Sequence, residues 1–134
     1  MWLFGAYSPI NGDHFDLILP HCNSGNFQIF LDEMSKEKPT ELKIMVLDNG
    51  AFHKAKKLII PDNIVLIFLP PYSPELNPSE NIWAKYKRAF TNKWFSNLEQ
   101  VEDFISNQVV SITQKEVMSI CGFPYVFSNQ IWTI

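Results

Sequence analysis

The first twenty residues form two apolar stretches around a polar break. The stretches are 2–9 and 14–20, and between them lies Asn11-Gly12. An Asn-Gly pair favours the tight turn that joins two antiparallel strands, because both residues tolerate a positive φ angle. The pattern therefore predicts a β-hairpin at the start of the chain.

The next segment has the spacing of an amphipathic helix. Asn23-Ser24 provides a capping side chain, and the periodic pattern continues to about Lys36 before Pro39 ends it. We expect one face of this helix to be buried. The apolar residues on that face are Phe27, Phe30, Leu31 and Met34.

Two nearly continuous apolar runs follow, at 42–49 and 64–70. Such runs are typical of strands buried on both faces. A short helix is predicted between them, from Lys54 to Leu58, before the break at 61–63. Strand, helix and strand in this order indicate a parallel crossover, so the sheet is expected to be mixed.

A proline-rich loop, 70–78, leads into a second long helix. Asn77 suits its cap, Pro78 its first position and Glu80 its third, and the pattern runs to about Lys93. Its inward residues are expected to be Ile82, Trp83, Tyr86 and Phe90.

One more helix is predicted from a capping box formed by Ser96 and Glu99. The tail from Cys121 onward is aromatic and yields no prediction of its own. The face of this helix that we expect to be buried carries Leu98, Val101, Phe104, Ile105, Val109 and Ile112.

Composition agrees with one globular α/β domain. The chain has 134 residues, of which 46% are hydrophobic and 19% charged, which excludes a disordered protein. No apolar run is long enough for a membrane span, and the start lacks the pattern of a secretory signal. Cys22 and Cys121 are far apart, without the spacing of a zinc site or a disulfide framework, which fits a reducing cytoplasm.

Charge is distributed unevenly along the chain. The net charge of −3 argues against a nucleic-acid binder, but residues 48–95 carry +3 while the remainder carries −6. A local positive field can attract a polyanion even when the whole chain is acidic.

Two carboxylates occupy positions where a metal site can form. Asp48 ends a buried strand, at the edge of the sheet where open α/β folds bind ligands. Glu80 opens a helix that follows the next strand. Hard cations such as Mg²⁺ prefer oxygen ligands and are often held by one or two carboxylates.

Each of these residues also has a structural interpretation. Glu80 fits a capping box, and this interpretation is favoured when Glu80 is considered by itself. Asp48-Asn49-Gly50 fits a simple turn. His53 alone is more often a surface residue than a ligand. The basic residues Lys85, Lys87 and Arg88 fit the solvated face of a helix.

Two longer motifs change this balance. They are LDNGAFHKAK at 47–56 and FLPPYSPELNPSENIWAKYKR at 68–88. Together they resemble the DDE transposases of bacterial insertion sequences related to the Tc/mariner superfamily. The likeness covers about residues 2–93, and the proline-rich string before Glu80 is too long to arise by chance.

The resemblance implies an α/β, ribonuclease-H-like mixed sheet and metal-dependent DNA cleavage followed by strand transfer. Asp48 and Glu80 match the second and third acidic metal ligands, which take Mg²⁺ or Mn²⁺. Asn49 and His53 match polar residues that accompany the second ligand. DNA phosphate contacts are expected from Lys54, Lys85, Lys87 and Arg88.

The family's first catalytic aspartate lies on a strand that would precede Trp2. Asp13 and Asp16 do not match that position. We therefore expect a single, incomplete catalytic domain over 1–134, with the motifs in 1–95 and a closing helix and tail in 96–134. The first strand, and a helix-turn-helix region ahead of it, are expected to be missing.

The expected partners are DNA at the transposon ends and target, an upstream transposase fragment, and a second copy of the chain in a homodimer. The expected location is the bacterial cytoplasm, with no membrane partner. One rival interpretation is an inactive remnant that folds or binds DNA without cleaving it. Another is a ribonuclease-H-type nuclease unrelated to transposition, against which the proline-rich loop argues.

Overall fold

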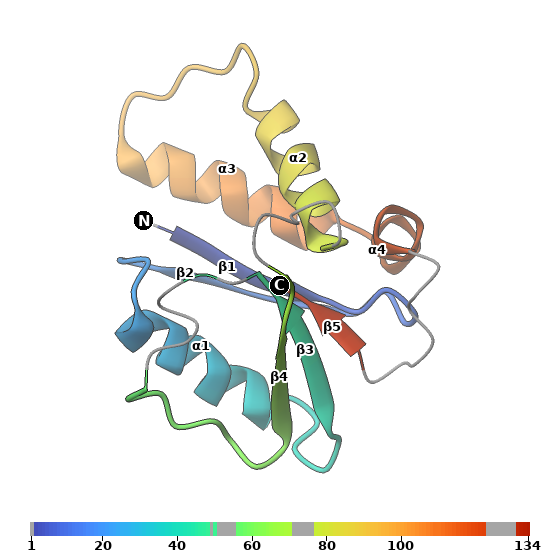
Figure 1. Cartoon of the computed structure of the whole chain (residues 1–134). Helices are drawn as coiled ribbons and strands as arrows, with labels where there is room; N and C mark the ends of the chain where they lie inside the picture. Colours follow the sequence, from blue (N-terminus) through green and yellow to red (C-terminus); the bar gives the residue numbers. More distant parts are fainter. Residues whose placement is uncertain (1, 49, 51–55, 71–76, 123–130) are drawn as a thin grey trace.

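The computed structural model describes residues 2–48, 50, 56–70, 77–122 and 131–134 (Figure 1). These residues form one mixed sheet with helices on both faces. The strand order is β2-β1-β5-β3-β4. Figure 1 shows α1 on one side of the sheet and α2, α3 and α4 on the other. The predicted α/β class with a mixed, ribonuclease-H-like sheet is confirmed.

The predicted hairpin and first helix are confirmed. β1 (Trp2–Tyr7) pairs antiparallel with β2 (His14–Leu19) along its whole length. Gly12 has a φ of +76° in the connecting turn, and a Cβ there would lie 2.2 Å from the Gln114 carbonyl oxygen. α1 (Ser24–Lys36) begins after Asn23, whose side chain accepts a hydrogen bond from the Asn26 backbone N–H.

The parallel crossover is also confirmed. β3 (Lys43–Leu47) and β4 (Ile64–Phe68) pair in parallel, so both end at the same edge of the sheet. Burial on both faces holds for β3 but is wrong for β4, where Val65 and Ile67 are 44% and 48% exposed. The physical reason is that β4 is an edge strand, beyond the reach of α2 and α3 (Figure 1).

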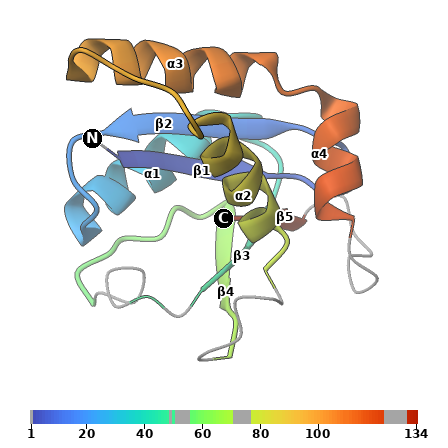
Figure 2. The ribbon, with the colours of Figure 1, turned by 90° about the horizontal axis from the view of Figure 1, so that it is seen from above.

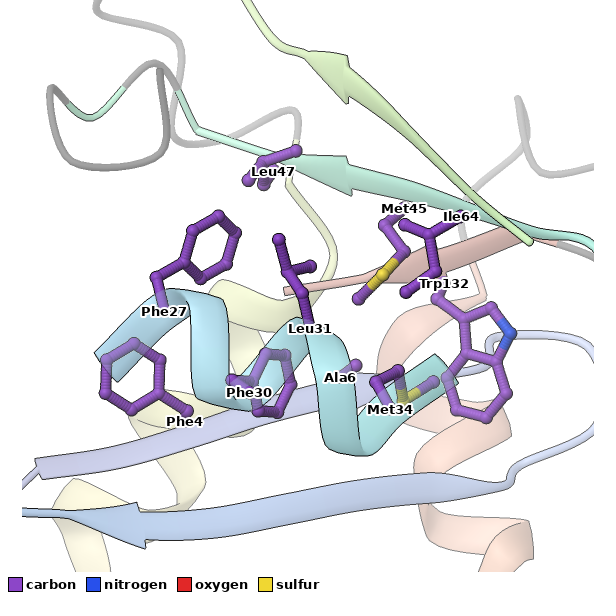
Figure 3. Packing of buried hydrophobic residues seen from close by; sticks show 10 residues of the cluster. All are labelled: Phe4, Ala6, Phe27, Phe30, Leu31, Met34, Met45, Leu47, Ile64 and Trp132. Atoms are coloured by element: carbon purple, nitrogen blue, oxygen red, sulfur yellow. The ribbon is translucent and has the colours of Figure 1, made fainter. Parts of the chain in front are cut away.

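The main core lies between α1 and the sheet. All four predicted apolar residues of α1 are fully buried, and they meet Phe4 and Ala6 of β1 and Met45 and Leu47 of β3 (Figure 3). Side chains alternate across a strand, so Tyr7 of β1 lies on the opposite face. There it packs in a second, smaller cluster. Its members are Tyr7, Ile82, Tyr86, Ile112, Val117 and Cys121.

Two helices differ from their predictions, one in where it ends and the other in the residue that caps it. α2 (Ser79–Ala89) is shorter than the predicted run to Lys93. α3 (Leu98–Ser111) is capped by Asn97 rather than by a capping box of Ser96 and Glu99, since the Asn97 side chain accepts from the Gln100 N–H. The predicted short helix at 54–58 lies partly outside the described residues, and Lys56 and Lys57 are in a turn.

Two elements were not predicted. α4 (Gln114–Cys121) begins with a capping box in which Thr113 and Glu116 bond reciprocally. β5 (Ile131–Thr133) comes from the tail and lies in the centre of the sheet, parallel to β3 and antiparallel to β1. The family resemblance implied that the first strand of the sheet would be missing. In the described residues, the position between β1 and β3 is occupied by β5. In the described residues, no helix is both long and apolar enough to cross a membrane.

Candidate active site

Asp48 directly follows β3 and is exposed to solvent. Its Oδ1 accepts a hydrogen bond of 3.2 Å from the Gly50 backbone N–H, which is the local turn that the sequence also allowed. The turn uses one lone pair of one oxygen, and a carboxylate has several. The hydrogen bond from Gly50 therefore does not by itself exclude Asp48 as a cation ligand.

The charge of Asp48 also reaches the loop before α1. Burial raises the pKa of the Cys22 thiol, and the nearby negative charge of Asp48 raises it further. This loop and the end of β3 thus lie at the same edge of the molecule.

Glu80 lies in the first turn of α2 and is partly buried. The capping box expected for it is absent, because α2 has no capping bond from its N-cap residue, Pro78. Asn77 supplies a local acceptor instead, with its Oδ1 3.2 Å from the Ser79 backbone nitrogen. Among the described residues, the Glu80 carboxylate thus makes no capping hydrogen bond, although its negative charge favours the helix N-terminus.

A short chain of hydrogen bonds joins the segments that carry the two acids. The Ile134 N–H donates to the Val46 carbonyl, two residues before Asp48, at 3.0 Å. The Asn77 side-chain amide donates to the Ile134 carbonyl at 2.7 Å. The Glu80 N–H in turn donates to the Asn77 carbonyl at 3.1 Å. Figures 1 and 2 both show the end of β5 between the β3–β4 pair and the start of α2.

A cavity of about 420 Å³ opens beside Glu80, between β1, α2 and α3. Its walls are mainly apolar, and its polar side chains include those of Glu80, Lys87 and Gln108. The sequence predicted core positions for Trp83, Tyr86 and Phe90. Tyr86 is buried in the second cluster and Trp83 packs against it, and all three also line this cavity. The lining residues are Trp2, Leu3, Glu80, Trp83, Tyr86, Lys87, Phe90, Ile105 and Gln108.

The candidate basic residues of α2 divide into two groups. Lys85 is turned toward α4, where its Nζ lies 3.6 Å from Glu116 Oε2. Lys87 and Arg88 are exposed in the last turn, and Lys87 shares the cavity with Glu80. Lys87 and Arg88 are therefore the residues of α2 best placed to meet a polyanion.

Three predicted site residues, Asn49, His53 and Lys54, lie outside the described residues.

Asp16 belongs to a different, buried cluster on the other side of β1. Its Oδ1 lies 2.5 Å from the Tyr7 hydroxyl and its Oδ2 2.5 Å from His14 Nδ1. The hydrogen bond to Asp16 raises the pKa of His14, and burial raises that of Tyr7. Asp16 lies on β2, three strand positions from β3, or about 14 Å at the usual spacing, so it does not complete a site with Asp48.

This cluster was not predicted from the sequence, although the alternation of side chains along β1 places Gly5 and Tyr7 on one face. Gly5 leaves the space that the cluster needs: a Cβ there would lie 2.6 Å from both Asp16 Oδ1 and the Tyr7 hydroxyl. Asp13 is likewise engaged, by Lys38 and Gln114. Both early aspartates thus have structural partners.

Among the described residues, no group of three or more His, Cys, Asp or Glu side chains is arranged to hold a metal ion. Asp48 and Glu80 are the candidate carboxylates, carried on the two segments that are linked through Ile134. Both are hard oxygen ligands of the type that Mg²⁺ accepts in ones or twos.

Comparison with known proteins decides the family. The family model for DDE superfamily endonucleases matches residues 1–102. The chain belongs to this family. The family resemblance inferred from the two motifs is confirmed, and the matched segment contains β1 through the first turn of α3.

A relative of this DDE endonuclease chain is the protein y4pE/y4sA of Sinorhizobium fredii (strain NBRC 101917 / NGR234), which is described as uncharacterized. The two are 40% identical over 100 residues, which cover 72% of this chain and 71% of the relative. α4 and β5 lie beyond the segment that the family model matches.

Proposed function

We propose that this chain is the catalytic domain of a transposase, which cleaves DNA phosphodiester bonds at transposon ends and transfers the freed strand to target DNA. Family membership supports the nuclease chemistry. The observation that carries the assignment of residues is the hydrogen-bonded link through Ile134, which joins the Asp48 segment to the Glu80 segment.

In this proposal Asp48 and Glu80 hold a divalent cation, Mg²⁺ or Mn²⁺. The donor chemistry fits, since both side chains are carboxylates and Glu80 is not used as a helix cap. When bound, the metal would activate the attacking oxygen and stabilise the charge that develops on the phosphate and leaving oxygen.

The other residues act on the DNA or on the ligands. Lys87 and Arg88 contact phosphates from the exposed end of α2, with Lys54 and Lys85 as further candidates. His53 holds a phosphate or orients Asp48, and Asn49 accompanies it. The DNA itself is the expected partner, with a second copy of the chain or an upstream transposase fragment as further partners.

One observation favours the rival interpretation, an inactive remnant. The described residues include two candidate ligands, Asp48 and Glu80, whereas the family resemblance implies three. A chain with two ligands can fold and bind DNA without cleaving it, or can depend on a separate segment for the third.

A cleavage assay separates these two interpretations. The substrate is duplex DNA carrying the ends of the element that encodes the chain, with Mg²⁺ or Mn²⁺, and the chain is tested alone and with an upstream segment that bears an acidic strand. Cleavage that disappears in Asp48→Asn and Glu80→Gln supports the proposal. The exposed-acid variant Asp103→Asn serves as the control and should cleave as the wild type does. Absence of cleavage under both conditions would favour the remnant.

A further inference from the structure

Asn77 is 2% exposed, and its side chain uses both ends of its amide. The Nδ2 donates to the Ile134 carbonyl at 2.7 Å. The Oδ1 accepts from the Ser79 backbone N–H at 3.2 Å and from the Ser79 hydroxyl at 2.9 Å. One end of this side chain therefore fixes the first turn of α2, and the other end binds the segment after β5.

The acceptor for Asn77 is itself held in place. β5 pairs with β3 at Ile44, Met45 and Val46, and the Ile134 N–H continues this ladder to the Val46 carbonyl. Trp132 anchors β5 in the main core beside Met34 (Figure 3). A bond to Ile134 is thus in effect a bond to the strand that carries Asp48.

Helix capping does not explain the amide. An aspartate at position 77 would offer the same oxygen acceptor to Ser79, and its charge would favour the helix N-terminus. It could not donate to the Ile134 carbonyl. The structural feature that needs asparagine is therefore the bond to β5, not the start of the helix.

We infer that Asn77 is a positioning residue, which sets Glu80 relative to Asp48 by bonding α2 to the end of β5. The inference rests on the proposed function, because it gives the two carboxylates a shared task. It assigns a role in the site to β5, although β5 lies outside the segment that matches the family.

Other contacts hold α2 in place on α4 and on β1 independently of Asn77. The Cys121 thiol lies 3.7 Å from the Pro78 carbonyl, and the Tyr86 hydroxyl lies 3.4 Å from that of Tyr7. The ring of Trp83 packs edge-on against Tyr7. We therefore expect Asn77→Asp to fold, with α2 present but its first turn released from β5.

The matched control is Asn63→Asp. Asn63 also donates its Nδ2 to backbone carbonyls, those of Ser35 at 2.8 Å and Pro39 at 3.3 Å, far from the proposed site. Like Asn77→Asp, the Asn63→Asp variant loses an amide donor to a backbone oxygen and gains one negative charge. Any effect specific to Asn77→Asp then reports on the link to β5.

The first measurement is the distance between nitroxide labels at positions 48 and 81, by dipolar EPR. Exposed Cys22 is replaced by serine, and Cys121 is buried and left in place. We expect one narrow distance distribution in the parent protein and in Asn63→Asp, and a broad or shifted one in Asn77→Asp. An unchanged distribution in Asn77→Asp would overturn the inference.

The second measurement is Mn²⁺ affinity in proteins that retain both carboxylates. Adding a negative charge at position 77 would by itself strengthen cation binding, so weaker binding can come only from displaced ligands. We expect Asn77→Asp to lose about tenfold, as is usual when a group that orients metal ligands is removed. Asn63→Asp should bind as the wild type does.

Failure of the inference and failure of the proposed function give different results. Broadened distances with an unchanged Mn²⁺ affinity would overturn the inference, because Asn77 would then act only on structure. Mn²⁺ binding that is absent, or that ignores Asp48→Asn and Glu80→Gln, would overturn the proposed function. The distance measurement would then still decide whether Asn77 fixes the two segments.

Discussion

Asp16, Tyr7 and His14 form a hydrogen-bonded polar cluster between β1 and β2. The Asp16 side chain is 5% exposed, and both of its oxygens are bonded. A buried charge is costly unless it is paired and hydrogen-bonded, so these contacts are needed for β2 to carry an acid on an inward face. This cluster also holds Tyr7 in place beneath α2.

The cluster should make stability depend on pH through His14. Its bond to Asp16 raises the pKa of His14 above the ordinary value of 6.5. Because the pKa of His14 is higher in the folded state than in the unfolded state, its charged form stabilises the fold. This stabilisation is fully present at pH values below the pKa of the unfolded state, and it is lost as the pH rises through the pKa of the folded state. The wild type should therefore exceed His14→Gln in stability by more at about pH 5.5 than at about pH 8.5.

Urea unfolding at both pH values measures this difference. We expect the advantage of the wild type to be of the order of 1 kcal/mol greater at the lower pH, as is typical of a hydrogen bond to a charged group. The neighbouring acid Asp13 also favours the charged histidine. An advantage that is equal at the two pH values would show that His14 does not titrate in this way.

Among the helices, the start of α3 tests the difference between sequence and structure directly. The structure gives the capping role to Asn97, while the sequence pattern favours Ser96. Asn97→Ala should lower the unfolding free energy by about 1 kcal/mol, because it leaves the Gln100 N–H without its acceptor. Ser96→Ala should change it by less than about 0.5 kcal/mol. Thermal unfolding of the two variants compares them, and the reverse order would favour the sequence pattern.

The basic end of α2 should contribute to DNA affinity without sequence preference. Replacing Lys87 and Arg88 together by alanine removes two expected phosphate contacts. The slope of log affinity against log salt should become shallower by about 2, since each contact on duplex DNA contributes about 0.9. Lys115→Ala, an exposed lysine on α4, is the control. Fluorescence anisotropy over a salt series gives the slopes, and equal slopes in all three proteins would remove these residues from the interface.

Local patterns predicted the elements whose partners are close in sequence. The hairpin, α1 and the β3–β4 crossover follow from turn chemistry, capping and periodicity. α4 had a usable pattern, because Thr113 and Glu116 have the spacing of a capping box. β5 had none, since three residues without a periodic pattern become a strand only when β1 and β3 are in place to pair with them.

The site shows the same division. Asp48 and Glu80 could be named as candidates from the motifs, and the structure brings their segments together. The roles of Asn77 and Ile134 could not be predicted, because their bond joins residues that are 57 positions apart. The cavity beside Glu80 could not be predicted either, because Tyr86 and Trp83 belong to the second core cluster and line the cavity as well.

At the scale of the whole molecule, the short β5 holds the two halves of the sheet together. Within the sheet of the described residues, the β1–β2 hairpin and the β3–β4 pair are hydrogen-bonded to each other only through β5. Its central residue, Trp132, is 8% exposed and packs in the main core. Loss of β5 would leave backbone groups of β1 and β3 unpaired, which favours aggregation.

Trp132→Ala should therefore destabilise the whole molecule. Truncating a buried tryptophan costs about 3–5 kcal/mol, which is a large part of the stability of a domain of this size. Trp94→Ala is a matched control, because Trp94 is 96% exposed and should change stability by less than about 0.5 kcal/mol. Calorimetry should show a lower and broader transition for Trp132→Ala alone. Similar transitions in both variants would mean that β5 does not join the two halves.

The most direct test of the shared metal site is a Mn²⁺ titration of the wild type, Asp48→Asn, Glu80→Gln and the double variant. If both carboxylates hold one ion, each single variant should weaken binding by about tenfold or more. In the double variant, the loss of Mn²⁺ affinity should be smaller than the product of the two single losses, because residues that bind the same ion are coupled. Unchanged binding in either single variant, or effects that simply multiply, would contradict a site shared by Asp48 and Glu80.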